Sequence, residues 1–104
     1  MEVKIVKPKS HLTLDKIYIV VGISQSDLRI VDDDGEPILY PISLFEIVDK
    51  AIPSDWEVVM GDEGETYWNP DFVKPGFYED WHDGDLEVRY VFAEYYQKLL
   101  NERA

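Results

Sequence analysis

The sequence predicts a single α+β domain over residues 1–104, with short strands in the first half and a helix at the end. Three observations lead to this prediction. The chain has 104 residues, the size of one ordinary domain, and 45% of them are hydrophobic, which is enough for a core. β-Branched and aromatic runs alternate with turn residues up to about residue 50. From Asp83 onward, apolar residues recur at helical spacing.

Five strands separated by turns are expected in the first half. They are Val3–Val6, Lys16–Ser24, Leu28–Val31, Pro37–Tyr40 and Phe45–Val48. The polar residues 24–27 form the turn between the second and third strands, and Gly35 is expected to supply a positive φ in the next turn. Ser43 and Glu46 fit a capping box, which predicts one helical turn before the last strand.

The second half is expected to add a β-hairpin and helices. Strands Trp56–Met60 and Glu65–Trp68 flank a turn with two glycines, and a turn of helix is expected over Phe77–Trp81. A longer helix follows, capped at its start by Asp83 or Asp85. Its predicted apolar stripe consists of Leu86, Val88, Val91, Phe92, Tyr95 and Leu99.

The order of the elements in the first half resembles that of an SH3-like β-barrel: strand, long loop, three-strand meander, helical turn and final strand. The residues that carry the resemblance are Leu14-Asp-Lys-Ile-Tyr-Ile-Val, Arg29-Ile-Val-Asp-Asp-Asp-Gly-Glu and Leu39-Tyr-Pro-Ile-Ser-Leu-Phe-Glu-Ile-Val. They are similar to small bacterial SH3-like domains and span about residues 10–50. The resemblance implies a barrel over residues 1–50, followed by the β-hairpin and the C-terminal helix. Such barrels bind peptides, nucleic acids or lipids, so the fold leaves the function open.

The second half resembles small uncharacterised bacterial proteins that carry the same barrel. The resemblance rests on Ile52-Pro-Ser-Asp-Trp and on Pro75-Gly-Phe-Tyr-Glu-Asp-Trp-His-Asp-Gly-Asp. Some of these proteins look like toxin-immunity or antitoxin partners. The resemblance therefore implies the architecture and suggests an immunity-type inhibitor.

Acidic residues dominate the charge of the chain. The formal net charge is -12, with 22 Asp and Glu against 10 Lys and Arg. Residues 55–87 hold half of the acidic residues and a single base, Lys74. This charge disfavours nucleic acid and anionic lipid as partners and favours a basic protein partner. The alternative is that the acidic residues serve only solubility.

The candidate partner-binding surface combines these acidic residues with aromatic side chains. Exposed aromatic residues surrounded by carboxylates are typical of a surface that binds a basic protein, whereas the alternative is that the aromatic residues pack in the core. The predicted partner-binding residues are Asp62, Glu63, Glu65, Trp68, Tyr78, Glu79, Asp80, Trp81 and Asp83.

A second function stays open, namely an SH3-like module that binds peptides or regulates another protein. Tyr18 and Tyr40 would supply its groove, beside the acidic turn at residues 32–34. The lack of a tryptophan near Leu28 argues against polyproline recognition.

Other functions find little support in the sequence. The chain has no cysteine, which excludes disulfides and thiolate chemistry. The acidic clusters that begin at Asp32 and Asp80 lack the spacing of a calcium-binding loop. Glu79, Asp80 and His82 could be drawn as an acid/base site, but no nucleophile motif or phosphate-binding loop accompanies them. We therefore expect a non-enzymatic, cytoplasmic protein with no metal, no cofactor and no membrane-spanning segment.

Overall fold

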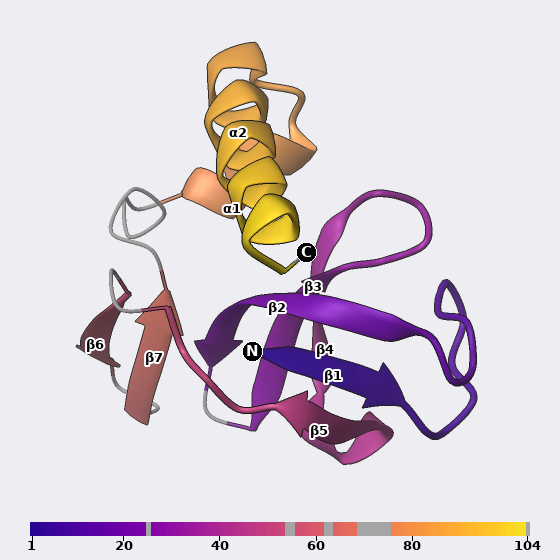
Figure 1. Cartoon of the computed structure of the whole chain (residues 1–104). Helices are drawn as coiled ribbons and strands as arrows, with labels where there is room; N and C mark the ends of the chain where they lie inside the picture. The colour runs from indigo at the N-terminus through magenta and orange to yellow at the C-terminus, as the bar shows by residue number, and fades with distance from the viewer. Residues whose placement is uncertain (25, 54–55, 62–63, 69–75, 104) are drawn as a thin grey trace. The chain divides into compact units, whose positions relative to one another are not determined.

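The computed structural model describes residues 1–24, 26–53, 56–61, 64–68 and 76–103, with only the backbone at 58–61, 64–68 and 103. The chain divides into two compact units, Met1–Asn69 and Pro70–Ala104. The first unit contains the strands and the second contains two helices (Figure 1). The α+β class is thus confirmed. The hairpin belongs to the first unit because its second strand joins the sheet of that unit.

The described part of the first unit contains seven strands, and each predicted strand is found within one residue of its predicted ends. They are β1 (Glu2–Ile5), β2 (Ile17–Ser24), β3 (Asp27–Val31), β4 (Pro37–Pro41), β5 (Phe45–Asp49), β6 (Glu57–Gly61) and β7 (Gly64–Trp68).

The strands pair antiparallel in the order β4-β3-β2-β1-β5. β2 is long enough to pair β1 through Ile17–Ile19 and β7 through Gly22–Ser24. β7 in turn pairs β6. The predicted barrel is not closed: β4 and β5 are the two ends of this path, and no pairing joins them within the described part of the chain.

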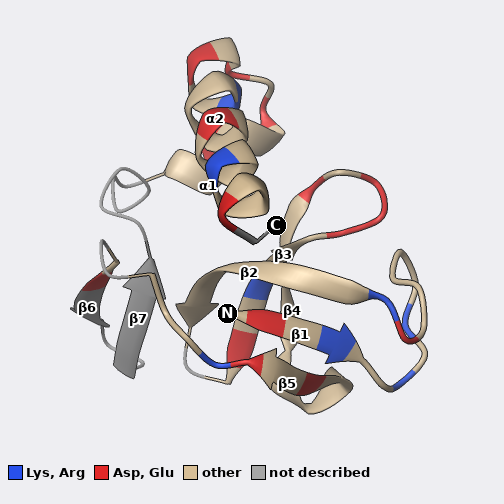
Figure 2. Ribbon diagram, viewed as in Figure 1, with Lys and Arg blue, Asp and Glu red and all other residues tan. Residues whose placement is uncertain are grey.

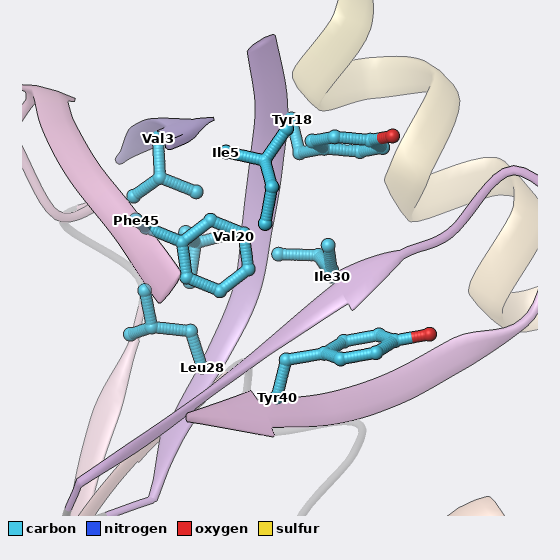
Figure 3. Packing of buried hydrophobic residues seen from close by; sticks show 8 residues of the cluster. All are labelled: Val3, Ile5, Tyr18, Val20, Leu28, Ile30, Tyr40 and Phe45. Atoms are coloured by element: carbon cyan, nitrogen blue, oxygen red, sulfur yellow. The ribbon is translucent and has the colours of Figure 1, made fainter. Parts of the chain in front are cut away.

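One face of the sheet carries the core of the first unit. Residues two apart on each strand point to the same face, and this periodicity accounts for the pairs Val3 and Ile5, Tyr18 and Val20, and Leu28 and Ile30. Tyr40 from β4 and Phe45 from β5 complete the cluster (Figure 3). The hydroxyl groups of Tyr18 and Tyr40 both point out of the cluster on the same side, so the polar end of each ring avoids the aliphatic residues.

The helical turn before β5 is present, but it is not capped as predicted. It is a 3-10 helix over Ile42–Leu44 that follows Pro41, and no side chain forms a cap hydrogen bond. Ser43 lies within the turn instead of before it, so its hydroxyl cannot act as the N-cap. The capping box predicted from Ser43 and Glu46 is therefore wrong.

Gly35 has the predicted positive φ, at +79°. Its N–H donates to the carbonyl of Asp32 at 3.0 Å, which closes the β3–β4 turn. A Cβ atom at this position would meet no atom within 4 Å, so the strain of a substitution comes from the positive φ of the backbone.

We expect Gly35→Val to lower the free energy of unfolding by about 1–2 kcal/mol, because a β-branched residue disfavours the left-handed region. Gly35→Asn is the matched control, since asparagine tolerates this region, and we expect it to lose less than half as much. Urea denaturation of both variants measures the difference. Equal losses in the two variants would contradict the backbone explanation.

The second unit is built from α1 (Phe77–His82) and α2 (Leu86–Arg103). The predicted cap of α2 is Asp85: its Oδ1 accepts the N–H groups of Glu87 at 3.0 Å and Val88 at 3.1 Å. Val88, Phe92 and Leu99 of the predicted stripe are buried, and Val91 and Tyr95 are half-buried. Leu86 is 83% exposed, so its place in the apolar stripe is wrong.

We expect Asp85→Ala to reduce the stability of α2 by about 1 kcal/mol, because two N–H groups at the helix start lose their acceptor. Ser43→Ala is the control, since it removes a hydroxyl that caps nothing, and should change stability by less than about 0.5 kcal/mol. Thermal unfolding followed by circular dichroism at 222 nm compares the two. A larger loss for Ser43→Ala would contradict the assignment.

Candidate functional site

The predicted partner-binding residues lie in three parts of the chain. Asp62 and Glu63 lie outside the described residues. Glu65 and Trp68 lie on β7, where Trp68 pairs with Gly22 of β2 and with Glu57 of β6. The other five, from α1 and the connection to α2, belong to the second unit and are Tyr78, Glu79, Asp80, Trp81 and Asp83.

Tyr78 does not present its ring to a partner. It is 9% exposed, and its ring makes edge contacts with Phe77 at 5.2 Å and with Phe92 at 6.1 Å between centroids. The contact with Phe92 packs α1 against α2, whereas Phe77 lies on α1 itself. Tyr78 is therefore a packing residue, in agreement with the alternative that aromatic side chains in this segment fill the core.

Trp81 is half-buried and also joins the two helices. Its ring lies 6.4 Å from that of Phe92, and the guanidinium of Arg89 lies 4.4 Å from its centroid. Arg89 Nε donates to the Trp81 carbonyl at 2.8 Å. The arginine is thus held against the tryptophan by stacking and by a hydrogen bond at once.

Carboxylates gather around the start of α2. Glu79 and Asp83 are exposed and Asp80 is half-exposed, and Asp85 and Glu87 follow directly. Figure 2 shows acidic residues along α1, the connection and α2. Residues 76–96 contain six carboxylates and one base, Arg89. The single charge of Arg89 offsets only one of these carboxylates, so the segment stays strongly negative.

The second predicted site, at the β3–β4 turn, is a structural network. Tyr18 and Tyr40 are 4% and 6% exposed, so neither offers an aromatic face to a peptide. The Tyr40 hydroxyl donates to Asp32 Oδ2 at 3.0 Å, and the Tyr18 hydroxyl donates to Asp33 Oδ1 at 2.8 Å. The groove predicted from these two tyrosines is therefore not formed.

Asp33 connects the long β1–β2 loop to the β3–β4 turn through hydrogen bonds. Its carboxylate accepts hydrogen bonds from Thr13 Oγ1 at 2.6 Å, Lys16 Nζ at 2.9 Å and the Tyr18 hydroxyl. These hydrogen bonds, that from Thr13 first, hold the pKa of Asp33 at about 2, well below its usual value. Its backbone N–H also donates to the carbonyl of His11 at 2.9 Å. The charge of this acidic turn thus serves the fold.

The pKa values of the two tyrosines are shifted upward, whereas that of Asp33 is shifted downward. Burial raises the pKa of Tyr18 and, together with the hydrogen bond to Asp32, that of Tyr40. Both hydroxyls therefore keep their protons at neutral pH and remain donors to the two aspartates.

The loop itself contains two residues in the left-handed region, His11 at φ 69° and Asp15 at φ 66°. Both residue types are among those that tolerate this region. The imidazole of His11 forms an ion pair with Asp34 when protonated, and the Asp15 N–H donates to the Ile5 carbonyl at 3.0 Å. Sequence reasoning missed these contacts because they join residues that are 10 positions apart, for Ile5 and Asp15, and 23 positions apart, for His11 and Asp34.

The structure offers no metal site within the residues it describes, where no group of three or more His, Asp or Glu side chains could hold an ion. His82, the histidine of the acid/base hypothesis, is exposed and contacts the ring of Trp81. The expectations of no metal, no cofactor and no catalysis stay predictions. Neither helix among the described residues has the length and apolar character that a membrane span requires.

In comparisons with known proteins, no family model matches the chain, and no match is found to a curated protein or to a solved structure. The candidate site therefore depends on the geometry above.

Proposed function

We propose that this protein is a non-enzymatic binding module whose second unit docks a basic protein partner. The observation that carries the proposal is the imbalance of charge around α1 and the start of α2. Glu79, Asp83 and Glu87 are exposed there, while Arg89, the base of this segment, lies on Trp81. Such a surface attracts basic proteins and speeds their encounter.

A more specific form of the proposal is an immunity-type inhibitor that blocks a basic toxin domain. The resemblance of the second half to small bacterial proteins, some of which look like toxin-immunity partners, supports this form. The excess of acidic over basic residues in the second half also supports it, because a basic toxin domain would be attracted. Co-expression with the product of a neighbouring toxin gene tests it: growth should recover only when this chain is present.

We further propose that β1–β5 represent a variant of the SH3-like fold with an open edge. The order of the elements supports it, since β1 pairs both β2 and β5, β2–β4 form a meander, and the 3-10 turn directly precedes β5. The function does not depend on this assignment.

We expect Glu79→Lys combined with Asp80→Lys to slow association with the basic partner about tenfold at low salt, because exposed charges steer diffusional encounter. The effect should shrink at high salt, where charges are screened within a few ångströms. Stopped-flow or surface plasmon resonance measures the rate, once the partner is captured by pull-down and purified.

The matched control is Glu36→Lys combined with Glu46→Lys, which changes the net charge equally at two exposed positions of the first unit. This control should leave the association rate within about twofold of the wild-type value if steering is local. Equal slowing by both variants would show that only the net charge matters, and the proposal for the second unit would then fail.

A further inference from the structure

The outer face of α2 carries an apolar pair that the fold leaves in solvent. Leu86 is 83% exposed and Tyr90 is 63% exposed. They stand four residues apart, so they are neighbours on the helix surface. Val88, Phe92 and Leu99 are buried, on the opposite side of the helix. The packing of the second unit therefore uses one face of α2 and leaves Leu86 and Tyr90 on the other.

The tyrosine ring is held along the helix. Its hydroxyl donates to Glu94 Oε1 at 2.8 Å, one turn further on. A ring that is already oriented loses less rotamer freedom when a partner covers it. Ala93 and Gln97 continue the same stripe, and both are exposed and uncharged. A shallow depression follows, lined by Glu94, Gln97, Lys98, Asn101 and Glu102.

Carboxylates border this stripe, and the nearby cations are engaged. Asp83 and Glu87 are exposed beside the apolar pair. Arg89 stacks on Trp81, and Lys98 lies 4.0 Å from Glu102 and over the ring of Tyr95. An apolar centre with a negative border complements a partner that carries an apolar side chain between lysines or arginines. A second copy of this chain, with a net charge of -12, would be repelled.

We infer that Leu86 and Tyr90 are the anchor of the partner-binding surface, and that they dock an apolar side chain of a basic protein segment. The inference rests on the proposed function and names its anchor. Tyr78, predicted as a partner-binding aromatic residue, is buried, so we place the apolar contact with the partner on the outer face of α2 instead. Tyrosine is enriched among binding hot spots, which lie near the centre of an interface, so Tyr90 is the stronger of the two anchors and Leu86 extends its apolar contact.

Two synthetic peptides test this inference separately from the charge attraction. One is lysine-rich with leucine at every third position, and the other has serine in place of each leucine. Isothermal titration at moderate salt should show that the wild-type chain binds the leucine peptide about tenfold more tightly than the serine peptide, because buried leucine contributes binding free energy that serine does not.

Leu86→Gln combined with Tyr90→Gln should abolish this preference and leave binding of the serine peptide unchanged. Glutamine keeps helix propensity, and both positions are exposed, so the fold should persist; circular dichroism checks it. The matched control is Ile47→Thr combined with Val48→Thr, which removes two exposed apolar side chains from β5. It should retain the preference.

Each of the other outcomes contradicts either this inference or the proposed function. Equal affinity of the wild-type chain for both peptides overturns the anchor and leaves the charge-based function standing. The inference is also overturned if the Leu86→Gln, Tyr90→Gln variant still prefers the leucine peptide, or if the β5 control loses this preference. Either result would place the apolar contact elsewhere. Failure of both peptides to bind at low salt would remove the proposed function itself.

Discussion

Replacement of Asp32 by alanine is expected to lower the free energy of unfolding by about 3 kcal/mol, the largest loss we expect from one substitution. Asp32 is 6% exposed. Its Oδ1 accepts the N–H groups of Asp34 at 3.0 Å and Glu36 at 3.1 Å, and its Oδ2 accepts the Tyr40 hydroxyl at 3.0 Å. Alanine would leave three donors without this acceptor. Tyr40 is buried, so water cannot readily replace the acceptor that its hydroxyl loses. Urea unfolding followed by circular dichroism measures the loss.

Two further variants separate the contributions of the two carboxylate oxygens. Asp32→Asn keeps an acceptor for the turn N–H groups, and we expect a loss of about 1 kcal/mol. Tyr40→Phe removes only the hydroxyl, and we expect a similar loss. Because Asp32 and Tyr40 share one hydrogen bond, the losses of Asp32→Ala and Tyr40→Phe should not add in the double variant. Full additivity would contradict a coupled pair.

Replacement of Asp33 by alanine is expected to lower the free energy of unfolding by about 2 kcal/mol at neutral pH. Three side chains donate to this carboxylate, and the hydrogen bonds to Thr13 and Lys16 fix the β1–β2 loop. The ammonium of Lys16 also lies 5.0 Å from the centre of the Tyr18 ring. Loss of the carboxylate therefore loosens several contacts of the loop at once. The same urea experiment measures the effect.

The contribution of Asp33 should depend on pH. Its pKa in the folded state is about 2, below the usual 3.8, so the unfolded chain takes up the proton first as the pH falls. The stabilisation is therefore complete above about pH 5 and is lost as the pH decreases through 3.8 toward 2. The difference between the wild type and Asp33→Ala should shrink over that range. A difference that stays constant from pH 6 to pH 2 would contradict this prediction.

Asp34→Ala provides the control for both measurements. Asp34 pairs with His11, and both side chains are more than half exposed. Exposed ion pairs contribute little to stability, so we expect a change of less than about 0.5 kcal/mol. The three consecutive aspartates should thus differ in their effect, in the order Asp32, Asp33, Asp34.

Local sequence patterns predicted the secondary structure closely. The strands and both helices were predictable because the period of apolar residues and the position of glycine, proline and aspartate depend on near neighbours along the chain. Gly35 with its positive φ and Asp85 as the cap of α2 are examples. Ser43 failed as a cap because the turn begins directly after Pro41, two residues earlier than a cap at Ser43 requires.

The candidate site was less predictable. Glu79 and Asp83 are exposed, as expected of charged side chains, which rarely become buried without partners. The division of the aromatic residues into packing and surface was not predictable, because Tyr78 and Tyr90 are chemically equal and stand in equally acidic segments. Contact with Phe92 buries the first, while the turn of the helix leaves the second exposed.

The sequence by itself determined the α+β class, the positions of the strands and helices, and the excess of negative charge in the second half. Only the tertiary structure decided that the sheet stays open between β4 and β5, that Asp32 and Asp33 serve the fold, and that Leu86 stands in solvent. Periodicity and charge are properties of neighbouring residues and can be read along the chain. Hydrogen bonds such as that from Thr13 to Asp33, and the burial of a ring between two helices, join distant residues, and these exist only after the chain has folded.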